Sequence, residues 1–315
     1  MLEYIDKIKT ISEELLTSGK VDMIIGFKKG SMPMINEPCI ARSSSDIKNL
    51  VWDSSCGINL ANYLTDRKEK IGIIAKGCDS RNIVNHIVEN KIKREQLIII
   101  GVPCKGMIDN KKISSMVNQE ITEASEKDGK IIVKGNGFDE TLNIQDILSE
   151  NCSICVHRNP VIYDELAAEL VEEQTDINRY EAVNKIEDMS SEEKRNYFDD
   201  LLSGCIRCYA CRNACPLCYC PTCFVDEAKP QWVGKSQNPA DIKTFHFLRA
   251  YHCAGRCTDC GSCVRACPME IDVRAFTKKL EKDCFDLYGW EAGLSTEQLP
   301  PLNTFNPNDP DDFIK

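Results

Sequence analysis

Short apolar runs in the first third of the chain predict a buried parallel sheet. β-branched and other apolar residues cluster at residues 21–27, 71–76 and 97–101, and runs of this length and composition are typical of strands buried on both faces. Between the second and third runs, residues 81–92 repeat apolar side chains with helical period. A strand, a helix and a strand in this order form a βαβ unit with parallel strands. The pattern predicts an α/β domain with a short parallel sheet over residues 1–163.

The second half of the chain changes to a helical pattern. Ser190 or Ser191, both residues of a type that caps helices, precedes an acidic first turn, and Gly204 ends the segment. Residues 241–252 repeat apolar side chains at helical spacing, and the aspartate that opens this segment is the expected cap. These features predict a mainly α-helical domain over residues 190–283.

Two polar segments flank this helical domain. Residues 164–176 carry a run of acidic side chains that is typical of the solvated face of a helix, so a helical connector is expected over residues 164–189. Residues 284–315 end in a stretch rich in Pro, Asn and Asp, which predicts an extended tail that is either disordered or laid on a partner.

Composition and charge limit the partners and the location. A chain of 315 residues is twice the size of a common domain of about 150 residues, which fits two domains. The net charge of -10 argues against nucleic acid and anionic membrane surfaces as partners. The amino-terminal segment is amphipathic and lacks a signal-sequence core, and no run of about eighteen apolar residues occurs. A cytoplasmic protein without membrane insertion is therefore expected.

Nineteen cysteines are the strongest chemical signal in the sequence. Thiols of a cytoplasmic chain stay reduced, which favours metal ligation over disulfides. The pattern Cys-x2-Cys-x2-Cys-x3-Cys-Pro occurs twice, and two complete copies are not expected by chance. The first copy contains Cys205, Cys208, Cys211 and Cys215, and the second contains Cys257, Cys260, Cys263 and Cys267.

This spacing is typical of two-cluster ferredoxins, in which the fourth cysteine of each run ligates the other cluster. Two [4Fe-4S] clusters are therefore expected. The ligands would be Cys205, Cys208, Cys211 and Cys267 for the first cluster, and Cys257, Cys260, Cys263 and Cys215 for the second. Zinc is the alternative, but a zinc ion needs only four ligands and gives no reason for a third Cys-x2 step.

Four further thiols have no place in the ferredoxin pattern. Cys218, Cys220 and Cys223 follow the first run, and Cys253 precedes the second. They are either ligands of an additional cluster or zinc ion, or small buried hydrophobic residues. The sequence leaves both interpretations open.

Two resemblances add to this reading. With a helix before each cysteine run, residues 190–280 resemble the helical two-cluster ferredoxin modules of succinate dehydrogenase and heterodisulfide reductase subunits. Residues 20–165 resemble the beta subunits of hydrogenases and formate dehydrogenases linked to coenzyme F420. The segments that carry the second resemblance are "WDSSCGINLANYL", "KGCDSRNIV", "GVPCKG" and "CSICVHRNPVIYDE".

The second resemblance implies a third [4Fe-4S] cluster and an FAD. The ligands of this third cluster would be Cys104, Cys152, Cys155 and Cys56, with Cys39 or Cys78 as rivals for the fourth position. Four soft thiolates gathered from strand ends and loops suit such a centre. The amino-terminal part is short for a beta subunit of this family, and no second segment that would enclose an isoalloxazine ring is evident, which weakens the FAD inference.

Histidines and arginines near the cysteines invite further roles. His157 follows Cys155 and is expected to tune that cluster through a hydrogen bond. The other histidines, His86, His246 and His252, have plain packing as their simplest explanation. Within or next to the ferredoxin runs, Arg207, Arg212, Arg256 and Arg265 would either raise cluster potentials, dock an acidic donor, or be ordinary surface charge.

The sequence therefore predicts an electron-transfer subunit of an anaerobic oxidoreductase complex, without catalytic residues of its own. The expected partners are a formate dehydrogenase or hydrogenase catalytic subunit, a flavin or heterodisulfide-reductase-like subunit, and ferredoxin. One alternative is an FAD-containing beta subunit that itself reduces a deazaflavin or similar carrier. The other is a zinc-stabilised interaction module. The sequence names neither the donor nor the direction of electron flow.

Overall fold

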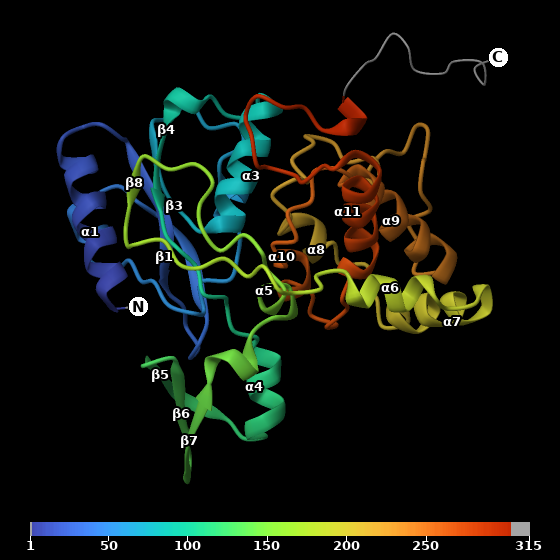
Figure 1. The fold of residues 1–315 in the computed structure, drawn as a ribbon, viewed down its shortest axis with the longest axis horizontal. Helices are drawn as coiled ribbons and strands as arrows, with labels where there is room; N and C mark the ends of the chain where they lie inside the picture. Colours follow the sequence, from blue (N-terminus) through green and yellow to red (C-terminus); the bar gives the residue numbers. More distant parts are fainter. Residues whose placement is uncertain (1, 304–315) are drawn as a thin grey trace.

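A computed structural model describes residues 2–303 of the chain. Figure 1 shows an α/β part, formed by the amino-terminal half, beside a helical part formed by the carboxyl-terminal half. A small three-stranded sheet projects from the α/β part (Figure 1). Within residues 2–303 no helix combines the length and the apolarity that a membrane crossing requires.

The main sheet has five strands in the order β2-β1-β3-β4-β8. They are β1 (Met23–Lys29), β2 (Asn36–Ala41), β3 (Ile71–Ala75), β4 (Leu97–Gly101) and β8 (Glu165–Leu166). The predicted βαβ unit is confirmed, because β3 and β4 are parallel and α3 (Gly77–Val88) connects them. The sheet is mixed rather than wholly parallel, since β2 pairs antiparallel with β1. Only a short turn separates these two strands, and a short turn can join antiparallel neighbours only.

Helices cover both faces of this sheet. The helix α1 (Leu2–Thr17) buries Ile8 and Leu15 against β1 and β3, and α3 packs against β3 and β4 on the side that faces the helical part (Figure 1). Shorter elements complete the α/β part. They are α2 (Ser44–Ile47), η1 (Leu60–Tyr63), η2 (Arg94–Gln96) and α5 (Glu150–Ser153).

The projecting sheet was not predicted. It consists of β5 (Ile121–Lys127), β6 (Lys130–Gly135) and β7 (Phe138–Asn143), packed with α4 (Asn110–Val117) and η3 (Ile144–Ile147). Asp128 and Gly129 join β5 to β6 with φ angles of 51° and 73°, which only glycine and a few polar residues adopt readily. The Asp-Gly pair at this turn was the available sequence signal for a hairpin.

The helical part consists of helices joined by loops, and the sequence predicted α7 and α9 among them. The helices are α6 (Glu181–Glu187), α7 (Ser191–Leu202), α8 (Ala210–Asn213), α9 (Pro239–His252), α10 (Ser262–Arg265) and α11 (Arg274–Tyr288), followed by η4 (Pro301–Asn303). Ser190 caps α7 through a capping box with Glu193. The cap of α9 is Asn238 rather than Asp241, because the Asn238 side chain accepts the Ala240 amide while Asp241 accepts hydrogen bonds from Ser236.

Two boundaries differ from the sequence prediction. The acidic segment 164–176 is not helical: it begins with β8, and the Glu173 carboxylate accepts the backbone amide of Asn159 at 3.1 Å. This long-range bond holds the segment against the loop after α5 instead of leaving it to coil. In addition, α11 extends to Tyr288, so the expected tail begins later, and residues 304–315 of that tail lie outside the described residues.

Polar side chains of α3 join the α/β part to the helical part. Asn82 Nδ2 lies 2.7 Å from Thr258 Oγ1, Asn85 Nδ2 lies 2.8 Å from the Arg256 carbonyl, and His86 Nε2 lies 2.6 Å from the Pro216 carbonyl. Buried polar groups are stable only when they are hydrogen-bonded, so these bonds fix one relative position of the two parts.

Candidate metal centres

The two cysteine runs are conformational copies of each other. In each run the residues two and four positions after the first cysteine are left-handed: Arg207 and Tyr209 have φ of 55° and 61°, and Asp259 and Gly261 have φ of 52° and 72°. A four-residue helix follows in both cases, α8 and α10, and these two helices contact each other. Successive backbone N–H groups in such turns form a concave anion-binding surface, which suits a negatively charged centre.

The first thiol group is Cys205, Cys208, Cys211 and Cys267. Cys205 interacts electrostatically with Cys208 and Cys267, and Cys211 interacts with Cys205 and Cys267. The fourth member comes from the other run, as the ferredoxin pattern requires. The backbone amide of Ile271 donates to Cys267 Sγ at 3.4 Å, a hydrogen bond of the kind that tunes cluster potentials.

A histidine for which plain packing was the simplest expectation lies beside this group. His246 Nε2 is 3.4 Å from Cys205 Sγ, and the residue is only 3% exposed. Burial, together with the nearby charges of Arg249 and Arg207, lowers the pKa of His246 to about 4. The ring is therefore neutral at physiological pH, and its contact with the cysteine sulfur is a hydrogen bond whose direction depends on the tautomer of the ring. His246 sits one turn from Arg249 on α9, so only the packing of that helix brings it to the cysteine.

The second thiol group is Cys215, Cys257, Cys260 and Cys263, and all four line one cavity. Burial raises the pKa of Cys263, and the charges of the other three are among the causes that raise it further, which agrees with their closeness. Cys253 lines the same cavity as a fifth thiol. The ferredoxin pattern does not account for this additional residue.

The third thiol group lies in the α/β part and consists of Cys78, Cys104, Cys152 and Cys155, which line a second cavity. Cys56 is not among them: it is fully buried elsewhere, where its sulfur accepts a hydrogen bond from Asn36 at 3.4 Å. The sulfur of Cys39 is likewise absent from the lining. Of the three rivals for the fourth position, the structure therefore brings Cys78 to the group.

The topology of the sheet explains this group. Cys78 lies in the first turn of α3, directly after β3, and Cys104 follows β4. Because carboxyl ends of parallel strands meet at one edge of the sheet, the two thiols are neighbours although distant in sequence. Helix α5 and the turn after it bring Cys152 and Cys155 to the same place. Burial raises the pKa of Cys104 to about 12 and that of Cys155 to about 11.

These raised pKa values bear on metal binding. Unligated thiols in such surroundings are protonated at neutral pH, and a bound metal replaces the protons. Four cationic side chains, Lys76, Arg81, Arg158 and Arg265, line the third group's cavity and would balance the negative charge of thiolate ligands. Four convergent soft donors with cationic neighbours fit a [4Fe-4S] cluster, and the first two groups offer the same set of donors.

Arg265 connects the second and third thiol groups. It belongs to the second cysteine run, yet Nη2 lies 3.3 Å from Cys152 Sγ, while Nη1 donates to the Gly57 carbonyl at 3.2 Å and to the Cys260 carbonyl at 2.9 Å. The two cavities also share part of their lining, namely Thr258, Asp259 and Cys260. The two groups are therefore immediate neighbours across the junction of the two parts.

The other arginines of the runs have structural partners. Arg207 donates to the Ser236 carbonyl at 2.7 Å, and Arg212 pairs with Asp226 at 2.9 Å. Arg256 pairs with Glu89 of the α/β part at 2.8 Å. Of the four arginines, Arg265 alone has a side chain that is hydrogen-bonded to a cysteine sulfur within residues 2–303.

The rings of two further histidines contact residues other than cysteine. The ring of His157 pairs with Glu291 at 2.7 Å, while its backbone carbonyl accepts a hydrogen bond from Cys155 Sγ at 3.4 Å. The expected hydrogen bond between this residue and the cysteine site therefore involves the main chain. His252 packs edge-on against Phe224, which fits the packing role expected of it.

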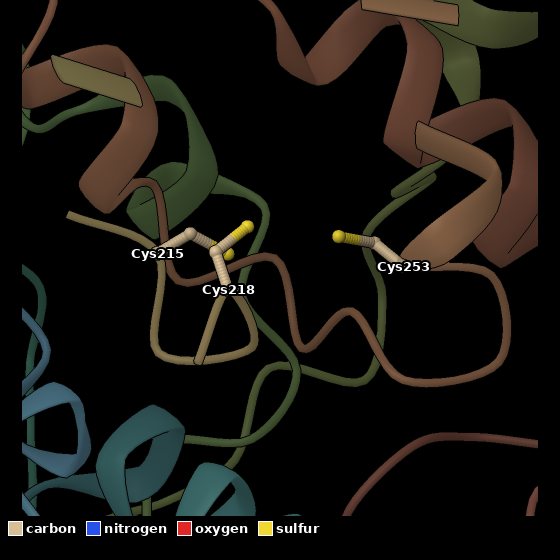
Figure 2. Close-up of side chains that lie close together, drawn as sticks. All are labelled: Cys215, Cys218 and Cys253. Atoms are coloured by element: carbon tan, nitrogen blue, oxygen red, sulfur yellow. The ribbon is translucent and has the colours of Figure 1, made fainter. Parts of the chain in front are cut away.

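The four additional cysteines near the ferredoxin runs, Cys218, Cys220, Cys223 and Cys253, do not form one group. Sulfur atoms of Cys215, Cys218 and Cys253 all lie within 4.8 Å of one another. Figure 2 shows Cys215 and Cys218 on one loop and Cys253 at the end of a helix, with their sulfurs directed toward the same space. Cys220 is exposed and, like Cys223, lies outside this trio.

A cleft of about 610 Å³ lies between the β1-β2 turn and the projecting sheet. Asp53 and Ser55 line it, and the same loop continues to Gly57, whose carbonyl accepts the hydrogen bond from Arg265. One loop therefore separates this cleft from the third thiol group. The volume is within the range of small-molecule sites, roughly 300 to 1,000 Å³.

Comparisons with known proteins give relatives over nearly the full chain. No protein-family model matches the chain. The chain is 24% identical, over 94% of its length and 93% of the relative's, to "F420-dependent formate dehydrogenase subunit beta" of Methanocaldococcus jannaschii. It is also 24% identical, over 94% of its length and 92% of the relative's, to "F420-dependent formate dehydrogenase 1 subunit beta" of Methanococcus maripaludis.

A solved structure is also similar to part of the chain. It is a chain of the F420-reducing [NiFe] hydrogenase complex from Methanosarcina barkeri, with 17% identity and a TM-score of 0.39. The similarity covers 50% of this chain and 62% of that one. The sequence matches, in contrast, include both the α/β part and the helical part, since they cover 94% of the chain. This chain is thus similar, over 94% of its length, to beta subunits of formate dehydrogenases that depend on F420.

Proposed function

We propose that this chain is an electron-transfer iron-sulfur subunit of an oxidoreductase complex of the formate dehydrogenase or hydrogenase kind, with a cytoplasmic location. The observation that carries this proposal is the contiguous arrangement of the three thiol groups. Cys260 lines the cavities of both the second and third groups, and Cys263 and Cys267 of one short segment belong to the second and first groups. Each group thus adjoins the next through shared or neighbouring residues.

The proposed ligands follow from these groups. Each group would hold one [4Fe-4S] cluster, with Cys78 in place of Cys56 as the fourth ligand in the α/β part. Bound clusters would supply one-electron transfer at potentials set by charge, hydrogen bonds to sulfur and burial. Three features support this proposal: Arg265 donates to Cys152 Sγ at 3.3 Å, His246 Nε2 lies 3.4 Å from Cys205 Sγ, and residues of both parts line the cavities of the second and third groups.

The partners follow from the names of the relatives, both of which are called beta subunits. We expect a catalytic dehydrogenase or hydrogenase subunit on one side, and a flavin or heterodisulfide-reductase-like subunit or ferredoxin on the other. Several large apolar side chains are available for such contacts. Trp232, Leu287 and Tyr288 are 66%, 72% and 60% exposed.

The cleft beside the loop 53–57 favours a second candidate function. In this alternative the chain binds FAD, as the sequence resemblance implies, and itself reduces a deazaflavin carrier; the names of the relatives include a dependence on F420. A redox cofactor in the cleft would lie next to the loop that contacts Arg265, close to the third thiol group. This closeness is the reason to measure flavin content directly.

The test is the iron, acid-labile sulfide, zinc and flavin content of the anaerobically purified chain, with electron paramagnetic resonance of its reduced form. About twelve irons per chain without flavin would support three clusters and electron transfer alone. About eight irons would remove the proposed centre in the α/β part. Stoichiometric FAD would favour the reductase, and zinc without sulfide would overturn both functions.

A further inference from the structure

We propose that Cys215, Cys218 and Cys253 form an additional metal site, distinct from the three clusters, that binds one divalent ion with a preference for thiolate ligands, such as Zn²⁺ or Fe²⁺. The proposed function assigns Cys215 to the second cluster and gives no role to the other two. The trio is defined by its own geometry, so this inference rests on the proposed function only through the sharing of Cys215.

The spacing of the sulfurs is the first argument. In a cubane, each cysteine binds a different iron, so the four sulfurs stand well apart around the cluster. Ligands of one ion share a single centre: with Zn–S bonds of about 2.3 Å and tetrahedral angles, their sulfurs lie about 3.8 Å apart. All three sulfurs of the trio lie within 4.8 Å of one another, which fits one shared ion.

The second argument is a buried cation at the trio. Arg249 is 4% exposed and interacts electrostatically with all three cysteines. One of its nitrogens donates to the Cys211 carbonyl at 3.0 Å, whereas Nε has no hydrogen-bond partner within residues 2–303. A buried guanidinium with a free donor is costly unless negative charge is nearby. Three thiolates around a divalent ion carry one net negative charge, which Arg249 would balance.

The way the chain holds the trio is the third argument. Cys253 ends α9 and is 2% exposed, and its backbone amide donates to the Ala250 carbonyl at 2.9 Å. Cys218 lies in the turn after the first cysteine run, with its amide bonded to the Cys215 carbonyl at 3.0 Å. Two rigid backbone segments thus present the sulfurs, as a preorganised site requires.

Three protein ligands leave one coordination position for another donor, since thiolate sites of this kind are tetrahedral. Because Cys215 also lines the cavity of the second thiol group, its thiolate would be shared between the additional ion and that group. The site would thus stand in direct contact with the second centre.

The experiment measures zinc, iron and acid-labile sulfide in the anaerobically purified full chain and in Cys218→Ser, with electron paramagnetic resonance of both. We expect the variant to lose about one metal ion per chain, while sulfide content and the cluster signals stay at wild-type levels. Cys253→Ser should give the same result. Cys220→Ser is the matched control, an exposed thiol two positions away, and should retain all metal.

Two results would overturn the proposal. Equal metal content in wild type and Cys218→Ser would show that the surplus thiols are packing residues. Loss of about four irons with their sulfide in Cys253→Ser would instead make Cys253 a cluster ligand. Neither result would affect the proposed electron-transfer function, which fails only if the wild-type chain contains no sulfide-bound iron.

Discussion

The thiol sites of the helical part and of the α/β part are built in opposite ways. In the helical part, each run supplies three thiols from seven consecutive residues, and left-handed residues at matching positions, such as Arg207 and Asp259, shape both turns alike. In the α/β part, the third thiol group draws on the ends of two strands and on a helix far along the chain. Local spacing defines the first kind of site, and sheet topology defines the second.

This difference decides how much a sequence reveals. The spacing within a run fixes which sulfurs can share a centre before any fold is known. A site at the edge of a parallel sheet depends on which loops the strands bring together, so several cysteines remain equivalent until the strands are placed. Cys56 and Cys78 were such rivals, and only the position of Cys78 directly after β3 distinguishes them.

The largest expected effect comes from replacing each of these two cysteines with serine in turn. Cys78→Ser should remove the centre of the α/β part, with a loss of about four irons per chain and one signal in the paramagnetic resonance spectrum. Cys56→Ser is the matched control and should retain the iron, because Cys56 is buried away from the cavity. Iron loss in Cys56→Ser but not in Cys78→Ser would contradict the assignment.

A smaller effect is expected from Arg265, the side chain that crosses between the two kinds of site. Arg265→Gln removes a positive charge and a hydrogen bond at Cys152 Sγ, so the oxidised centre loses less stabilisation than the reduced one and its midpoint potential should fall. A charged hydrogen bond contributes roughly 1.5 to 3 kcal/mol, and about 1.4 kcal/mol corresponds to about 59 mV for one electron. A decrease of up to about 130 mV is therefore expected.

Redox titration followed by paramagnetic resonance would measure this shift. Arg212→Gln is the control, because Arg212 pairs with Asp226 on the surface and its replacement should leave the potential unchanged. Equal potentials in wild type and Arg265→Gln would mean that the arginine only fastens the two parts together.

The smallest effect concerns the ion pairs that join the connector to the end of the chain. Burial alone would raise the pKa of Glu291, but hydrogen bonds from His157 and Arg179 hold it well below its usual value. The carboxylate therefore stabilises the fold above the unfolded pKa of about 4.3, and this contribution is lost only as the pH falls through the lower folded pKa. Glu291→Gln should lower the thermal unfolding temperature at every pH from 8 to 5, and the difference from wild type should not decrease as the pH falls over this range.

Thermal unfolding across that pH range checks the prediction, with the exposed Glu297→Gln as control. A difference between wild type and Glu291→Gln that shrinks markedly between pH 8 and pH 5 would show that the carboxylate takes up a proton in the folded state.

The same contrast between local and long-range order explains which parts of the fold the sequence predicted. The βαβ unit around α3 and the helices α7 and α9 follow from apolar periodicity and helix caps. Both of these signals are contained in a few neighbouring residues. The segment 164–176 reads as a helix by composition, yet Glu173 is held by Asn159 from another loop. His246 and Arg249 were similarly hidden, because their importance depends on what α9 faces.

The shared lining of two cavities has a consequence for how the protein is made. Residues 258–260 stand between the second and third thiol groups and touch both, so closure of the two parts encloses both sites in a single event. For the proposed clusters, iron and sulfide would therefore have to arrive before the two parts dock. A chain that docks early would seal unfilled sites, and maturation of this protein is expected to depend on the timing of delivery during synthesis.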